Sequence, residues 1–174
     1  MKHTDCCTSG QTTRTDADHE LVRIEKAKGN CNLCEDYAQR QQHKPVAVMS
    51  CDGACLRGEI ARQAANLLCH SLEKERTVRI CLGGAFTKNT GQRGLVRNAP
   101  RVLALEGCPV HCASRMMRGV IEGLEVEIVR ADLLCDFDRS RFGIDEMTPE
   151  EILVRAREVA QKVAATLHQE TAAK

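Results

Sequence analysis

Short apolar runs that alternate with helix-periodic segments constrain the fold of this chain more than any other feature. After the first run, apolar residues recur at the spacing of one helix face, from Leu56 through Ile60 to Ala64. A last helix is predicted to start at Thr148, because a Thr cap, a following Pro and Glu151 form a capping-box pattern. The apolar runs are residues 46–51, 77–82, 101–105 and 125–129.

This order predicts a mainly parallel sheet of about four strands with helices on both faces. The predicted fold class is therefore a three-layer αβα domain of the flavodoxin or Rossmann-like kind, over residues 45–174. Residues 1–44 are polar and are expected to form an N-terminal extension, with one weak helical stretch at residues 20–26. A chain of 174 residues suits one domain with such an extension.

Composition argues against several classes of partner. Aromatic residues make up only 2% of the chain and the net charge is +1, which disfavours a nucleic-acid surface. No apolar run approaches the roughly 18 residues of a membrane span, and the polar N-terminus lacks a signal-peptide core. We therefore expect a cytoplasmic protein with no nucleic-acid or membrane partner. A metal ion is the expected partner, and the sequence identifies no protein partner.

Eleven cysteines in this chain require a chemical explanation. Stable disulfides are rare in a reducing compartment, so clustered thiols favour metal or redox chemistry. Several cysteines follow predicted strands, and the carboxyl ends of parallel strands meet at one edge of a sheet, where ligands bind. The predicted metal ligands at this edge are Cys51, Cys81, Cys108, Cys112 and Cys55, with Cys135 as a further candidate.

The N-terminal extension contains another pair of thiols, Cys31 and Cys34, separated by two residues. Such a spacing can grip one metal ion within a turn. Together with Cys6 and Cys7 the pair predicts a small separate zinc site, although the spacing between the pairs is not that of a standard zinc knuckle. The alternative is a tail whose thiols have no common role.

Residues 106–112 place two thiols between the third strand and a helix. If that helix begins at Pro109, Cys108 is its cap and Cys112 lies one turn in, so both sulfurs can face the same point. The helix N-terminus is expected to favour thiolate over thiol. His111 would then point away from the sulfurs and is not expected to be a ligand.

Three spaced motifs together resemble the DGC-domain family, over roughly residues 45–160. They are Val46 to Cys51 with Gly53-Ala54, Cys81-Leu82-Gly83-Gly84, and Glu106-Gly107-Cys108-Pro109-Val110-His111-Cys112-Ala113, with Ala131-Asp132-Leu133 beyond them. The resemblance implies a zinc-binding protein whose family cysteines match Cys51, Cys81, Cys108 and Cys112. The Asp-Gly-Cys that names the family reads Glu106-Gly107-Cys108 here, and Cys55 stands where relatives often have a small or hydroxyl residue.

The chemistry of these thiols leaves alternatives open. Thiolates suit zinc in a tetrahedral site, but they also suit an iron–sulfur cluster in an electron-transfer protein. The same cysteines could instead act as the nucleophiles of a thiol or persulfide enzyme. Arg57, Arg79 and Lys88 either offset thiolate charge or belong to an ordinary solvated surface. The sequence contains no recognisable hydrolase or phosphate-loop motif, so whether the protein is an enzyme stays open.

Overall fold

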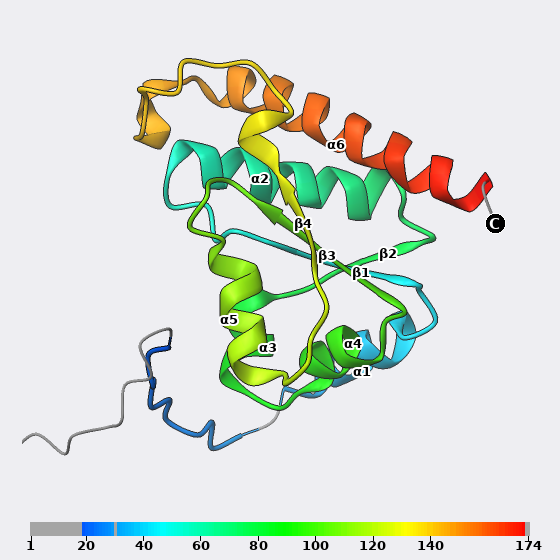
Figure 1. Cartoon of the computed structure of the whole chain (residues 1–174). Coiled ribbons are helices and arrows are strands. Elements are labelled where there is room, and N and C mark those ends of the chain that lie inside the picture. Colours follow the sequence, from blue (N-terminus) through cyan, green and yellow to red (C-terminus); the bar gives the residue numbers. More distant parts are fainter. Residues whose placement is uncertain (1–18, 30, 173–174) are drawn as a thin grey trace, which may run out of the picture.

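A single parallel sheet forms the centre of the computed structural model, which describes residues 19–29 and 31–172 (Figure 1). The strands are β1 (Val46–Ser50), β2 (Thr77–Arg79), β3 (Arg101–Glu106) and β4 (Glu127–Arg130). They are ordered β2-β1-β3-β4, and each neighbouring pair runs parallel. The predicted four-stranded parallel sheet is therefore confirmed.

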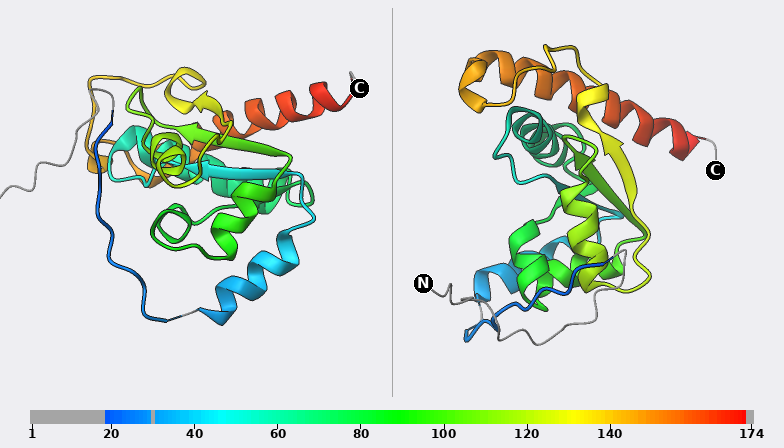
Figure 2. Two further views of the ribbon diagram at one scale, coloured as in Figure 1. Left: turned by 60° about the horizontal axis from the view of Figure 1, so that its bottom comes forward. Right: turned by 60° about the vertical axis from the view of Figure 1, so that its left-hand side comes forward.

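Helices cover both faces of the sheet, which confirms the three-layer architecture (Figures 1 and 2). Helices α2 and α6 lie side by side on one face, whereas α1, α3, α4 and α5 lie on the other. Short 3-10 turns occupy Ala131–Leu133 and Ile144–Glu146, and a π-helical turn, Leu68–Leu72, extends α2. The helices are α1 (Asn32–Gln41), α2 (Leu56–Leu67), α3 (Leu82–Thr87), α4 (Gly91–Asn98), α5 (Cys112–Val120) and α6 (Pro149–Ala172).

The strand residues alternate between two hydrophobic clusters. Val46 and Val48 pack under α2 and α6, while Ala47 and Met49 pack toward α4 and α5. This alternation follows from the two-residue repeat of a strand, which turns successive side chains to opposite faces. With both faces covered, β1 is buried along its whole length, as expected for a central parallel strand.

The start of α6 is confirmed in detail. The backbone N–H of Thr148 donates to Glu151 Oε2 at 2.8 Å, and the N–H of Glu151 donates to Thr148 Oγ1 at 3.2 Å. This reciprocal pair is the predicted capping box. One face of α6 is buried: Ile152, Ala156, Val159, Val163 and Leu167 all lie in the cluster between α6 and the sheet.

Four local predictions are wrong. Residues 20–26 are not helical, and the N-terminal helix is α1 instead. Strand β2 ends at Arg79, because the chain turns into α3 with Cys81 as its N-cap, where the N–H of Cys81 donates to Gln92 Oε1 at 3.0 Å. The fourth strand begins at Glu127, two residues later than predicted. Helix α5 begins at Cys112 rather than at Pro109, for a reason that lies in the candidate site.

The chain order places a topological switch point between β1 and β3. From β1 the chain crosses over α2 to β2, and it then returns on the other face to β3, on the opposite side of β1. The loops that follow β1 and β3 therefore diverge at the carboxyl edge of the sheet. In open α/β sheets this crevice is where ligands bind.

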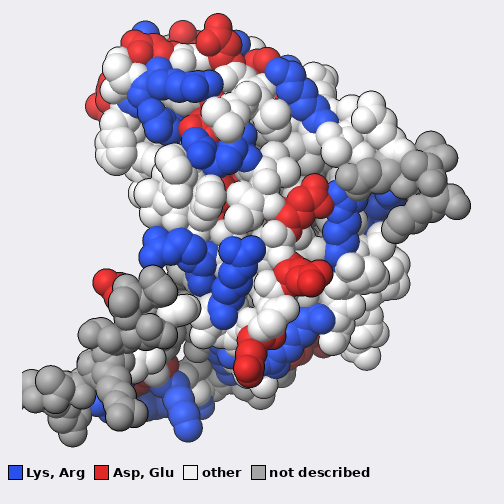
Figure 3. Space-filling view, in the orientation of Figure 1, with Lys and Arg blue, Asp and Glu red and all other residues white. Residues whose placement is uncertain are grey.

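The division of the chain at residue 45 stays a prediction, although α1, which precedes it, packs against α4. Glu35 of α1 accepts a hydrogen bond from the Gly91 backbone N–H at 2.9 Å. On the face shown in Figure 3, basic and acidic side chains are interspersed. In the described part of the chain no helix has the length and apolar character to cross a membrane.

Candidate functional site

The centre of the candidate site is a buried contact between Cys51 and Glu106, which end neighbouring strands. The Cys51 thiol donates to Glu106 Oε2 across 3.1 Å, and the N–H of Gly107 donates to Cys51 Sγ, also across 3.1 Å. Glu106 is fully buried and Cys51 is 7% exposed. The predicted ligand Cys51 is therefore a protonated thiol that is held from both sides by the β3 end.

Glu106 also determines where α5 begins. Its Oε1 accepts the N–H of Ser114 at 2.8 Å, and its Oε2 accepts the N–H of Ala113 at 3.3 Å. The first N–H groups of a helix have no partner within it, so a carboxylate placed there acts as a cap. Because Glu106 lies at the end of β3 and caps α5 at Cys112, residues 107–111 form the loop that connects this strand to this helix. The loop closes at His111, which has a left-handed backbone with φ of 54°.

Burial and the neighbouring acid keep the nearest thiols protonated. Burial first, and then the hydrogen bond and charge of Glu106, raise the pKa of Cys51 to about 12. The pKa of Cys112 is also raised, by burial first and then by the charges of Glu106 and Cys108. The expectation that the helix N-terminus would favour a thiolate is therefore wrong for Cys112, because these effects are larger.

Cys112 lies within electrostatic range of both Cys51 and Cys108. Each of the pairs Cys51–Cys112 and Cys108–Cys112 is close enough that a charge on one sulfur acts on the other. Cys112 is exposed and Cys108 is partly exposed, so both side chains have room to rotate. Cys108 also lies within electrostatic range of Arg130, which is paired with Asp132 at 2.7 Å.

His111 differs from its predicted role. It precedes α5 instead of lying inside the helix, so the argument that helix geometry turns it away from the sulfurs does not hold. Its Nε2 atom is buried and has no hydrogen-bond partner in the structure. A buried ring nitrogen without a hydrogen-bond partner is costly unless something binds it. His111 is therefore an additional candidate ligand.

Gly107 is required by close packing between the β3 end and the start of α2. A Cβ atom built on Gly107 would lie 2.6 Å from the carbonyl carbon and oxygen of Arg57, and 2.6 Å from the backbone nitrogen of Gly58. All of these are backbone atoms, which cannot rotate out of the way. In the Glu-Gly-Cys triplet, Glu106 thus caps α5, Gly107 allows the backbone of α2 to pack closely, and Cys108 supplies a thiol.

Cys81 belongs to a second group of thiols. It caps α3, and Cys34 of α1 is close enough to be influenced electrostatically by both Cys81 and Cys31. Gln92 joins the group, since its side chain accepts the N–H of Cys81 and hydrogen-bonds to Cys34. Burial is the main cause that raises the pKa of Cys34. Cys34, which was expected to form a separate site with Cys31, therefore lies near Cys81, while Cys6 and Cys7 fall outside the described residues.

The remaining cysteines have other surroundings. Cys55 is the N-cap of α2, and none of its recorded contacts within the described residues is to another cysteine. Cys135 is buried beneath α6, donates to Ala131 O at 3.6 Å, and has Glu158 as its strongest charged neighbour. Cys69 is buried in the same cluster and is a core residue.

The donors are near one another without forming a preassembled metal site. Across residues 19–29 and 31–172, no three His, Cys, Asp or Glu side chains are grouped so that they could hold a metal ion. Ligation through these thiols would therefore require side-chain rotation and loss of the Cys51 proton. The chemistry of the set nevertheless fits a thiophilic cation, because it combines thiols, an unused imidazole nitrogen and a backbone N–H that already bonds to sulfur.

Fold and site together define a cysteine-rich α/β protein with a candidate site at the carboxyl edge of a parallel sheet. A family model described as the DGC domain matches residues 47–163, and the chain belongs to this family. The resemblance seen in the sequence is thereby confirmed. Comparisons with curated proteins and with solved structures gave no match.

Sequence reasoning missed two functional side chains, Glu106 and Arg79. Glu106 is the last residue of the apolar strand β3, and an acid at the end of a buried strand indicates that the fold supplies it with hydrogen-bond donors. Arg79 was expected either to offset thiolate charge or to belong to a solvated surface, and it lies partly buried against the β1 end. Its position in the short strand β2, where the neighbouring residues are apolar, is the signal that could have indicated this burial.

Proposed function

We propose that this protein binds a thiophilic metal ion through Cys51, Cys108 and Cys112 at the switch point between β1 and β3. The observation that carries the proposal is that Cys51, bonded to the Glu106 carboxylate and the Gly107 N–H, lies within electrostatic range of Cys112, which in turn lies within range of Cys108. Convergence of this kind at the ligand-binding edge of the fold is unexpected for cysteines that serve only packing.

Zinc is the ion whose preferences match this donor set best, since it favours sulfur and nitrogen in a tetrahedral arrangement. Cys81, on the far side of β1, or His111 would complete four ligands. The N–H of Gly107 is already aimed at Cys51 Sγ, and such a donor offsets part of the negative charge that thiolates carry. A bound ion would fix the 107–111 loop against the β1 end.

The proposal includes a reducing compartment such as the cytoplasm. Each of the nine described cysteines is a free thiol. Disulfides would otherwise be expected among so many cysteines. The high pKa of Cys51 also disfavours the alternative of a thiol enzyme that uses Cys51 as its nucleophile, because the thiolate is the reactive form.

The test is purification without oxygen, followed by metal analysis and a visible spectrum. We expect one zinc per chain, no absorbance beyond the protein band, and proton release when zinc is added to the chelated protein. Cys112→Ser and Cys108→Ser should each weaken zinc affinity at least tenfold in competition with a chromophoric chelator. Cys135→Ser is the matched control, because its hydroxyl can keep the bond to Ala131 O and affinity should be unchanged.

Other outcomes select other functions. A brown protein that contains iron and sulfide would show that the cysteines hold an iron–sulfur cluster instead of zinc. A protein without metal that accepts sulfane sulfur would favour the thiol enzyme and overturn metal binding. Cys81→Ser decides whether the β2 end shares the ion, since unchanged stoichiometry and affinity would remove Cys81 from the ligand set.

A further inference from the structure

A hollow of about 510 Å³ opens beside the thiols, at the carboxyl ends of β1 and β2. Its volume is within the range of small-molecule sites. The wall combines apolar residues, Ile80 and Leu82, with the polar groups of Ser50, Asn66 and two arginines, Arg62 and Arg79. The metal proposal gives this space no role.

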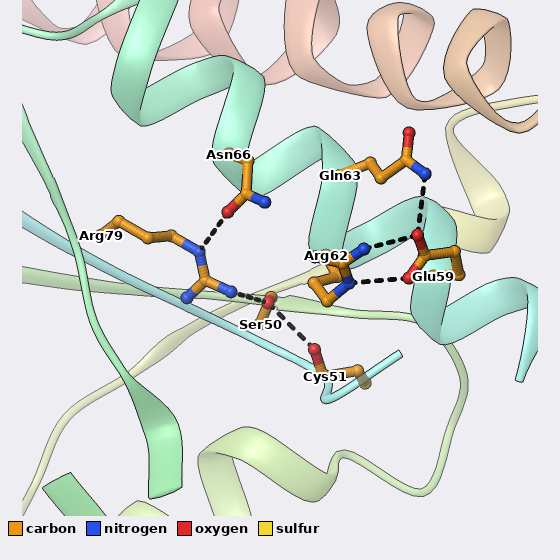
Figure 4. A network of polar contacts seen from close by, with 7 residues as sticks. All are labelled: Ser50, Cys51, Glu59, Arg62, Gln63, Asn66 and Arg79. Carbon is orange, nitrogen blue, oxygen red and sulfur yellow. Dashed lines mark hydrogen bonds and ion pairs between the residues drawn. The ribbon is translucent and has the colours of Figure 1, made fainter. Parts of the chain in front are cut away.

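Arg79 is held at the wall entirely by neutral acceptors (Figure 4). Its Nε donates to Asn66 Oδ1 at 3.0 Å, its Nη1 to Ile80 O at 2.6 Å, and its Nη2 to Ser50 Oγ at 2.6 Å. A weaker Nη1 contact reaches Val48 O at 3.5 Å. These bonds fix the orientation of the guanidinium but leave its charge without a counter-charge.

The charged groups around Arg79 do not supply the missing negative charge. Among the described residues, none pairs a carboxylate with Arg79, and Arg62 is the only charged Lys or Arg side chain recorded as acting on it. The side chain of Arg79 is partly buried, and Arg62 lies within electrostatic range of it. Two guanidinium groups that repel each other across one hollow are stabilised when an anion lies between them.

Arg62, unlike Arg79, is paired with a carboxylate. Its Nε and Nη2 donate to the Glu59 carboxylate at 2.7 and 2.6 Å (Figure 4), and its Nη1 makes no hydrogen bond within the described residues. Asp52 and His70 also line the hollow, and both are exposed to solvent. Asp52 also attracts Arg62, so the partly buried charge at the wall that lacks a counter-charge is that of Arg79, and the second N–H of Arg79 Nη2 has no acceptor among the described residues.

We propose that this hollow binds a small molecule through an oxyanion group, a carboxylate or a phosphate, with Arg79 and Arg62 as its anion-binding side chains. Guanidinium groups match these anions in geometry and form charge-assisted hydrogen bonds with them. Ile80 and Leu82 would contact the apolar body of the ligand. Cys51 and Cys81 also line the hollow, so the bound molecule would lie beside thiols of both groups.

The site does not depend on a metal ion. The test is calorimetric titration of the full chain with sodium phosphate and, separately, sodium acetate, against sodium chloride at matched ionic strength. Circular dichroism melts serve as the second readout, because the chain contains no Trp. We expect saturable binding of phosphate or of acetate. Which of the two anions binds shows whether the hollow prefers a phosphate or a carboxylate. We expect Arg79→Gln to weaken this binding at least tenfold.

Arg93→Gln is the matched control. Arg93 of α4 is also partly buried and also bonds to neutral carbonyls, those of Ala85 and Phe86, but it lies outside the hollow. It should bind the anion as the wild type does. If Arg79→Gln does not fold, Arg62→Gln gives the answer, since Arg62 is 40% exposed and its loss should weaken binding several-fold. The proposal is overturned if neither anion binds beyond chloride, or if the folded arginine variants bind as tightly as the wild type.

Discussion

Gly107→Ala tests whether the β3 end must touch the backbone of α2. The φ of Gly107 is not in the left-handed region, so its backbone conformation accepts alanine and any penalty is steric. The new Cβ would lie 2.6 Å from three backbone atoms of Arg57 and Gly58. Carbon atoms prefer separations of about 3.5–4.0 Å, so the loop and the helix would have to separate by about 1 Å.

The expected destabilisation is about 3 kcal/mol, the upper end for overpacking, because no side chain can rotate to relieve the clash. For a domain of this size that corresponds to a fall in Tm of about 6–12 °C. Urea denaturation followed by circular dichroism measures the free energy of unfolding directly. The Gly107 N–H would also be displaced from Cys51 Sγ, so zinc affinity should fall with stability.

Gly94→Ala is the matched control for this substitution. Gly94 lies within α4, and a Cβ there would meet no atom within 4 Å. The same chemical change should therefore stabilise the protein by about 0.5–1 kcal/mol, since glycine is unfavourable inside a helix. Opposite signs at the two positions are the decisive result. If Gly107→Ala stays within about 0.5 kcal/mol of the wild type, the close approach is not a packing requirement.

Three further predictions follow from single residues. The pKa of Cys51 is raised to about 12 in the fold, so the unfolded chain loses this proton at lower pH than the folded chain does. The stability advantage of the wild type over Cys51→Ala should therefore shrink above about pH 9, by up to about 4 kcal/mol at pH 12. Urea titrations across that pH range measure this difference. Cys55→Ser should stabilise α2 by about 0.5–1 kcal/mol, because Cys55 is an N-cap without a side-chain hydrogen bond; an unchanged or lower Tm would contradict this. Gly91→Ala would place a Cβ onto the Cβ of Ala38 and should loosen α1 from α4, seen as faster alkylation of Cys34; an unchanged rate would mean that α1 is not held by this contact.

The architecture could be predicted from the sequence because its signals are local. Each strand is a short apolar run, and the α6 start carries its own cap in Thr148 and Glu151. The apolar face from Leu56 to Ala64 needed only the helical period to be recognised. Such patterns are sufficient for element type and order, and these in turn restrict the topology.

The errors arose where distant residues decide the local structure. Helix α5 begins at Cys112 because a carboxylate from the preceding strand caps it, and that partner is not recognisable from the helix sequence. Strand β2 ends early where Cys81 becomes the N-cap of α3, and the N–H of Cys81 is held by Gln92 of α4, a partner distant in the sequence. The electrostatic preference of a helix N-terminus was outweighed at Cys112 by burial and a neighbouring acid.

The predicted ligand set illustrates the same limit. Strand-end positions were enough to expect Cys51 near Cys108 and Cys112, since parallel strands end at one edge. The grouping of Cys81 with Cys34 depends on where α1 packs, which no strand pattern specifies. Which of these thiols hold an ion stays a prediction until metal content is measured.

Glu106 makes the start of α5 an indicator for the thiol site. The same carboxylate accepts the amide protons of Ala113 and Ser114 and the thiol proton of Cys51. A change in what Cys51 binds must therefore alter the charge distribution that these two amides experience. Their nuclear magnetic resonances should shift together when the site is occupied, so the chemistry at a buried sulfur can be followed from backbone signals without labelling any cysteine.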